Sequence, residues 1–223
     1  LFYNVQFNDV YCGMKIIRND FFKNSNFFSE GMVFCLEILI KSKIMEAKVS
    51  EVPITLHKDG RINSKSHLKT IKDGLKTLKF ILISSPKWIF FFPSILSFFI
   101  CSIFFLFILN STNYNFTNIK IITLMLLFYT SFQFFMLGLF SSLRAKKLGL
   151  GKGLWLDKFF KLFSLRLSLI ISFIIIVIPF FYLIMDYNFF STDIVFLLLS
   201  FNIFFGVSLA GNSLTVSLLS LNK

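Results

Sequence analysis

The sequence has few acidic residues and few cysteines, and long stretches of it carry no charge. It holds 11 Asp and Glu against 23 Lys and Arg, which gives a net charge of +12. Cys12, Cys35 and Cys101 are scattered and odd in number, which argues against a disulfide framework or a zinc site. The first residues are mixed polar and apolar with no apolar leader region, so we expect no signal peptide. Because the chain starts at Leu1 without an initiator Met, we expect that an N-terminal part is missing.

Four uncharged apolar runs predict transmembrane helices, since about 20 residues cross a hydrocarbon core. They lie at about Ile89–Leu109, Ile121–Leu143, Leu167–Met185 and Ile194–Leu221. Their interiors contain no Asp, Glu, Lys, Arg or His, groups that translocation paths and proton relays usually carry. We therefore interpret the runs as an anchor and assembly surface. Their polar residues, among them Gln133 and Asn202, predict hydrogen bonds or small packing contacts between helices.

The charge of the connecting loops predicts the topology. The loop from Arg144 to Arg166 holds seven basic residues and one acidic residue, Asp157. The positive-inside rule places this loop and the N-terminal part on the cytoplasmic side, and four spans return Lys223 to the same side. We expect a multi-pass protein of a bacterial plasma membrane with both termini cytoplasmic. Homo-oligomerisation is possible.

The first 60 residues have the pattern of an α/β domain. Alternating or apolar stretches predict strands at Tyr3–Phe7, at Val10–Ile17 with a break at Gly13, and at Val49–Leu56 with Pro53 at an edge or strand end. An apolar helix is predicted from about Met32 to Lys43. The expected fold class is thus an α/β remnant followed by an all-α membrane region of four helices. The predicted domains are 1–66, an amphipathic interfacial helix at 67–88, and a transmembrane domain at 89–223.

Residues 67–82 have helical periodicity with two adjacent stripes. The apolar stripe is Leu68, Ile71, Leu75, Leu78 and Leu82, and the basic stripe is Lys69, Lys72, Lys76 and Lys79. Such a helix fits a lipid surface, where lysines reach toward phosphates, and Trp88 fits the headgroup level. The alternative is a solvated helix packed on the soluble domain. A membrane span follows within a few residues, which favours the interfacial interpretation.

Three ordered motifs resemble the second half of a family-2 glycosyltransferase. They are Asp9-Val-Tyr-Cys-Gly-Met-Lys15, Gly31 to Lys41, and Glu51-Val-Pro-Ile-Thr followed by Lys58-Asp-Gly-Arg61. The dolichol- and polyprenyl-phosphate sugar synthases, including bacterial membrane-anchored relatives, are the most similar group. Those relatives also have a segment like His67 to Gly74 and then Ser-Pro-Lys-Trp88 ahead of the membrane. The resemblance covers about residues 5–90, and the spans match only in type and position.

The resemblance implies a GT-A fold, a UDP- or GDP-sugar donor, a divalent metal (Mg or Mn), and a polyprenyl or dolichyl phosphate acceptor. The family holds its metal with an Asp-x-Asp motif, and none occurs in this sequence. We therefore expect the donor and metal sites before Leu1 and an inactive fragment in isolation. Lys15 stands where the family usually has Arg, which keeps the charge without the bidentate fork. Val33 stands where relatives often have Glu.

Transfer to a lipid phosphate needs cations that neutralise the acceptor and the departing diphosphate. Arg61 and Lys65 form a compact set with Ser64 and His67 just before the interfacial helix, and the resemblance identifies this stretch as the phosphate-contacting one. A solvated basic turn is the alternative. Asp9 either orients the Gly13 turn or a sugar hydroxyl, or simply caps a turn. Glu37, buried by pattern, either pairs with a basic residue of the site or forms a structural ion pair.

Two functions from different classes follow. The first is transfer of a sugar to a polyprenyl or dolichyl phosphate at the cytoplasmic membrane face, by a membrane-bound glycosyltransferase of which this chain is a fragment. The alternative is a non-enzymatic four-span protein, such as a lipid-carrier flippase or an assembly partner. Nucleic-acid binding is a poor fit, because the lysines follow the membrane boundaries.

Overall fold

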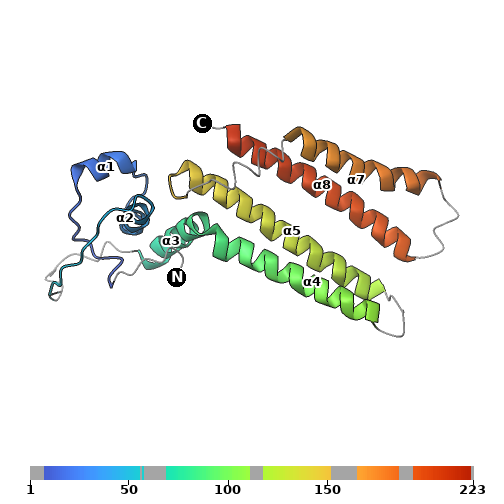
Figure 1. The fold of residues 1–223 in the computed structure, drawn as a ribbon, viewed down its shortest axis with the longest axis horizontal. Coiled ribbons are helices and arrows are strands. Elements are labelled where there is room, and N and C mark those ends of the chain that lie inside the picture. Colours follow the sequence, from blue (N-terminus) through green and yellow to red (C-terminus); the bar gives the residue numbers. More distant parts are fainter. Residues whose placement is uncertain are drawn as a thin grey trace. The chain divides into compact units, whose positions relative to one another are not determined.

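The computed structural model describes residues 8–55, 57, 69–110, 118–151, 165–185 and 193–221. Within these ranges the chain forms helices joined by irregular segments (Figure 1). It divides into two compact units. The first comprises residues 1–85 and 144–152, and the second comprises residues 86–143 and 153–223.

The predicted α/β class is wrong, because the described residues contain no strand. Residues 10–17 and 49–55 are irregular, and the strand expected at 3–7 lies outside the described residues. An alternating pattern forms a strand only where a neighbour accepts its backbone hydrogen bonds and a surface covers its apolar face. Neither is found for the second stretch among the described residues: Val49, Val52 and Ile54 are exposed, and Pro53 has no N–H to donate.

The first unit is built on helices α1 (Asn19–Ser25), α2 (Met32–Ile44) and α3 (Thr70–Ser84). The prediction of α2 from about Met32 is confirmed. Helix α1 was not predicted; it ends at Asn26, which adopts the left-handed conformation that Asn tolerates better than most residues (φ 45°, ψ 61°). Gly31 precedes α2 with φ 62°, a conformation that favours glycine.

The apolar core of the first unit combines residues that are far apart in the sequence. Val33 and Ile40 of α2 pack with Phe80 of α3 and with Ala145 and Leu150. The last two belong to the end of α5 (Asn118–Lys147) and the turn that follows it. That turn is a Schellman motif: Leu150 N–H donates to the Ala145 carbonyl (2.8 Å), and Gly149 (φ 69°) N–H donates to the Lys146 carbonyl (3.1 Å). The motif turns Leu150 into the core, where it is 2% exposed.

The second unit contains η1 (Lys87–Phe91), α4 (Phe92–Asn110), most of α5, α7 (Leu165–Met185) and α8 (Asp193–Leu221). All four predicted apolar runs are therefore helical. Three stretches are long and apolar enough to cross a membrane: Lys87–Ile108, Ile119–Lys147 and Leu197–Ser217. They indicate an integral membrane protein. In α7 the apolar stretch Arg166–Pro179 is shorter, so a fourth crossing stays a prediction.

Small polar side chains join α4 to α5. Ser94 Oγ donates to the Ser131 carbonyl and Ser131 Oγ donates to the Ser94 carbonyl, each at 2.9 Å. Ser97 Oγ donates to the Leu127 carbonyl at 3.2 Å, and Cys101 Sγ contacts the Leu124 carbonyl at 3.7 Å. The partner numbers fall along α5 as they rise along α4, so the two helices run antiparallel. Such contacts suit apolar surroundings, where small residues let helix backbones approach closely.

Helix α5 joins α8 through a polar cluster that we define as Tyr129, Gln133, Ser208 and Asn212. Gln133 Nε2 donates to Ser208 Oγ at 2.6 Å, and Tyr129 Oη lies 3.4 Å from the same hydroxyl. The prediction that Gln133 bonds between helices is thus confirmed. Asn202 instead donates to the Leu198 carbonyl of its own helix at 2.9 Å.

Helices α7 and α8 lie alongside each other (Figure 1), with Gly206 of α8 at the contact. A Cβ atom added at Gly206 would lie 2.6 Å from Ile176 Cγ1 and 3.1 Å from the Ser172 carbonyl oxygen. The absent side chain therefore allows this close approach.

Candidate functional site

The first candidate residues lie in the irregular segment that opens the described chain. Its start is tied to the beginning of another predicted motif: Asn8 N–H donates to Glu51 Oε1 at 3.0 Å, and Asn8 Nδ2 donates to Glu51 Oε2 at 2.7 Å. Hydrogen bonds to a carboxylate are stronger than those between neutral groups. The structure therefore brings the Asp9 and Glu51 motifs together without a sheet. The sequence carried no sign of this pairing, since 43 positions separate the two residues.

Asp9 caps a local turn. Its Oδ1 accepts the Tyr11 N–H at 2.9 Å, which is an Asx turn. The structure thus shows the turn cap, and a contact of Asp9 with a sugar hydroxyl stays a prediction. Gly13 has no positive φ and no neighbour within 4 Å of a built Cβ. The turn itself does not require glycine there.

Lys15 closes the same segment on itself. Its Nζ donates to the Cys12 carbonyl at 2.5 Å and to the Val10 carbonyl at 3.2 Å. An ammonium group has three N–H donors, so two of them serve the backbone here. The charge stabilises the 10–15 turn, and the expected phosphate contact stays a prediction.

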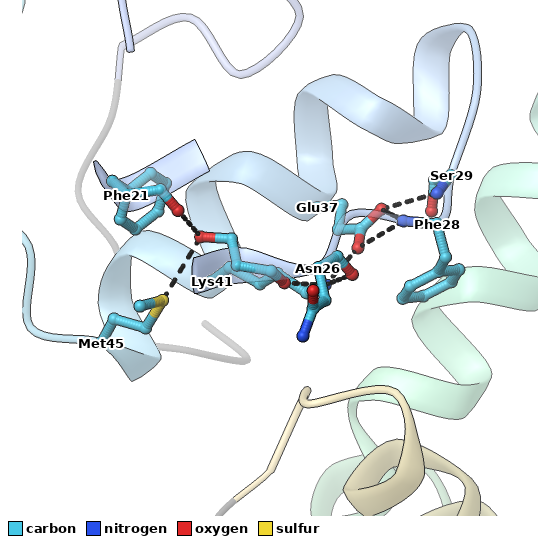
Figure 2. A network of polar contacts seen from close by, with 8 residues as sticks. Phe21, Asn26, Phe28, Ser29, Glu37, Lys41 and Met45 are labelled. Carbon is cyan, nitrogen blue, oxygen red and sulfur yellow. Dashed lines mark hydrogen bonds and ion pairs between the residues drawn. The ribbon is translucent and has the colours of Figure 1, made fainter. Parts of the chain in front are cut away.

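Glu37 and Lys41 form a buried ion pair one helical turn apart on α2. Glu37 Oε1 lies 2.6 Å from Lys41 Nζ, and the side chains are 0% and 3% exposed. Figure 2 shows both side chains directed at the segment between α1 and α2. Glu37 accepts the N–H groups of Phe28 and Ser29, the latter at 2.8 Å. The carboxylate therefore satisfies backbone donors that would otherwise be buried without partners.

Lys41 completes this network from the other side of the segment. Its Nζ donates to the Ser25 and Asn26 carbonyls, both at 2.7 Å, and lies 5.2 Å and 5.0 Å from the ring centroids of Phe27 and Phe28. The three ammonium donors thus all have acceptors, which is the condition under which a buried charge is tolerated. The structure places Glu37 in a structural ion pair, one of the two alternatives. The i, i+4 spacing in the sequence could have identified Lys41 as the partner.

The residues expected to contact phosphate most directly, Arg61, Ser64, Lys65 and His67, lie outside the described residues. The chain is described again from Lys69, which precedes α3. The Lys69 N–H donates to Asp73 Oδ2 at 3.0 Å, and the Asp73 N–H donates to the Lys69 carbonyl at 2.8 Å. Asp73 thereby caps the start of α3, where a negative charge also complements the helix dipole.

The expected membrane-interface residues are at the surface of the structure. Lys69, Lys72, Lys76 and Lys79 are exposed, and Trp88 in η1 is half exposed with its ring 6.3 Å from that of Phe92. Helix α3 packs on α2 through Phe80 rather than through its predicted apolar stripe. No sequence pattern favoured Phe80, because it belongs to neither stripe and lies on the side of the helix opposite the apolar one.

Metal-ligating groups do not gather in this part of the chain. Across the residues that the structure describes, no group of three His, Cys, Asp or Glu side chains could hold a metal ion. The donor set that a divalent cation needs is therefore not found among them.

A stretch of 94 residues is 28% identical to a protein described as the low-salt glycan biosynthesis hexosyltransferase Agl6 of Haloferax volcanii. The match covers 42% of this chain and 22% of that relative, so it spans about a fifth of the relative's length. No protein-family profile and no solved structure matches the chain. The similarity is thus to part of a hexosyltransferase.

Proposed function

We propose that the protein carrying this chain is a membrane-bound glycosyltransferase. The observation that carries the proposal is the similarity to part of a hexosyltransferase. A second observation supports a membrane location for the reaction: the helix after the candidate residues ends at Ser84, and a stretch able to cross a membrane starts at Lys87. The proposed reaction moves a sugar from a nucleotide-sugar to a polyprenyl or dolichyl phosphate at the cytoplasmic face.

In this reaction an oxygen of the acceptor phosphate attacks the anomeric carbon of the sugar. The bond from that carbon to the nucleoside diphosphate breaks, and the diphosphate leaves with the electron pair. Both the acceptor and the leaving group are anionic, so fixed cations lower the barrier by offsetting their charge. We assign this role to Arg61 and Lys65, with Ser64 and His67 as hydrogen-bonding neighbours.

The anchored segment 8–15 has a supporting role in the proposal. Asn8 holds it to Glu51, and Lys15 and Asp9 fix its internal turns. Gly13 leaves open space beside this backbone. We propose that the donor or acceptor passes close to Gly13, with Lys15 contributing charge. Residues other than those described would bind the divalent metal.

The test uses membranes that contain the whole protein. They are incubated with labelled UDP- and GDP-sugars and with polyprenyl or dolichyl phosphate, and lipid-linked sugar is measured by mass spectrometry. Arg61→Ala and Lys65→Ala are expected to lower the transfer rate by about 10²–10³-fold, the loss typical of one charge-stabilising donor. Membrane insertion should be unchanged.

Arg18→Ala is the matched control, because Arg18 is exposed and pairs only with the neighbouring Asp20 among the described residues. It should retain the activity of the unmodified protein. Wild-type rates in both the Arg61 and the Lys65 variants would refute the site assignment. A protein that transfers no sugar to any polyprenyl phosphate would refute the function.

A further inference from the structure

Helix α3 has one face that packs against the first unit. Phe80 and Ser84 are buried, and Asp73 and Thr77 are half-buried. These four residues follow one another at intervals of four, three and four, so they lie on a single side of the helix. Phe80 contacts the core formed with Val33 and Ile40 of α2. The helix is therefore anchored by a narrow stripe.

The apolar residues of α3 are on the opposite side. Ile71, Leu75 and Leu78 are 81%, 62% and 53% exposed. At about 100° per residue they lie roughly half a turn away from the Phe80 stripe. The packing of α3 on α2 thus leaves this apolar face exposed within the described part of the first unit, and the interfacial interpretation of the face stays a prediction. An apolar face of this kind beside a candidate membrane span needs a partner.

The lysines occupy only one of the two flanks between these faces. Lys72, Lys76 and Lys79 are exposed and lie about a quarter-turn from both the packed and the apolar stripes. The other flank carries Thr70, Gly74 and Ile81 and has no charge. None of the three lysines forms an ion pair within the described residues. Three uncompensated positive charges therefore border the apolar face on one side.

We propose that α3 binds an anionic lipid surface, with Ile71, Leu75 and Leu78 in the acyl boundary and the lysine flank on lipid headgroups. Charge complementarity and position both point to a membrane as the partner. The lysine stems run along apolar surface while their ammonium groups reach phosphate depth. The helix ends at Ser84, just before the candidate span that starts at Lys87, so the bilayer surface lies within its reach.

Because the lysines lie on one flank only, we expect α3 to bind the lipid surface in one rotational orientation. Anionic headgroups bind along that flank, and the uncharged flank carries no such attraction. Each lysine near an anionic surface raises the equilibrium constant for binding that surface roughly fivefold. This partner does not depend on the proposed sugar transfer, because it follows from the surface of α3 alone.

The test places the whole protein in nanodiscs of phosphatidylcholine, with or without phosphatidylglycerol, and measures hydrogen–deuterium exchange of the α3 amides. We expect α3 to exchange at least fivefold more slowly in the anionic discs, and high salt to reduce the difference because it screens the charges. The variant Lys72→Gln/Lys76→Gln/Lys79→Gln should lose the difference. Ile71→Ser/Leu75→Ser/Leu78→Ser should raise exchange in both kinds of disc.

The matched control is Lys23→Gln/Lys43→Gln/Lys48→Gln, which removes the same charge from exposed lysines of the first unit that lie off α3. It should behave as the unmodified protein. Equal exchange in both kinds of disc would overturn the proposal. Slower exchange of the α3 amides when inorganic phosphate is added to neutral discs would also overturn it. So would slower exchange that depends on the number of protein copies per disc and not on lipid charge. If α3 exchanges more slowly in anionic discs but the protein has no transferase activity, only the proposed function is refuted.

Discussion

Glu37 and Lys41 are both buried on α2 and lie 2.6 Å apart, and between them they bind four backbone groups of the segment that connects α1 to α2. The pair holds that segment against α2 through hydrogen bonds, so neither charge is left without a partner. The two residues lie one turn apart on a single helix, so both side chains reach the same segment (Figure 2).

The stability losses caused by removing Glu37 and Lys41 one at a time should not add up to the loss caused by removing both. Lys41→Met leaves the Glu37 carboxylate buried without its counter-charge, and Glu37→Gln leaves the ammonium in the same state. We expect each single variant to lose about 3–5 kcal/mol in the free energy of unfolding, the usual cost of an unpaired buried charge. The double variant should lose much less than the sum. A double-mutant cycle on thermal unfolding in detergent measures this, and strictly additive losses would contradict the role of the pair.

Gly149 should not tolerate a side chain. Its φ of 69° lies in the left-handed region, where an L-residue costs roughly 1–2 kcal/mol. We expect Gly149→Ala to lower the free energy of unfolding by about that amount, because the turn directs Leu150 into the core. Gly151→Ala is the control, since Gly151 has no positive φ and a Cβ there would make only an ordinary 4.0 Å contact with Ala145. Equal stability of the two variants would show that the turn is not strained by a side chain.

Two glycines of α8 should respond oppositely to the same substitution. In Gly206→Ala the new Cβ meets Ile176 and the Ser172 carbonyl, so we expect α7 to separate from α8 at a cost of about 1–3 kcal/mol. Gly211→Ala meets nothing within 4 Å, so it should gain the usual helix-forming advantage of Ala, about 0.5–1 kcal/mol. Thermal stability in detergent measures both effects. A stabilising Gly206→Ala would contradict the close helix contact.

Ser208 should contribute measurably to the association of α5 with α8. It accepts the Gln133 amide and lies within reach of Tyr129 and Asn212. We expect Ser208→Ala to weaken the α5–α8 association by about 0.6–1.7 kcal/mol, the range measured for hydrogen bonds between membrane helices. Ser200→Ala is a suitable control, because Ser200 bonds only to the Leu197 carbonyl of its own helix among the described residues. Cysteine cross-linking between α5 and α8 would measure the difference, and equal yields would refute the role of Ser208.

The sequence predicted the longer helices well because their signals are local, whereas the short helix α1 was missed. Uncharged runs indicated the four helices of the second unit, and an apolar run indicated α2 within one residue of its observed end. The strands failed because alternation is also local, whereas a strand depends on a partner elsewhere in the chain. The alternating residues Val49, Val52 and Ile54 have no such partner among the described residues and are exposed.

The candidate site was less predictable for the same reason. The Glu37–Lys41 spacing was visible in the sequence, and so were both stripes of α3. The link between Asn8 and Glu51, and the choice of Phe80 as the packed residue of α3, depend on contacts between distant segments. The basic set at Arg61 and Lys65 stays a prediction, because it lies outside the described residues.

The core around Val33 and Phe80 also includes Ala145, near the end of the second candidate membrane span in the chain, and Leu150, which follows that span. A ribosome therefore makes the first part of this core long before the last. Until Leu150 emerges, Val33, Ile40 and Phe80 lack the apolar residues that cover them. We expect the first unit to finish folding only after the whole of α4 and α5 has been made.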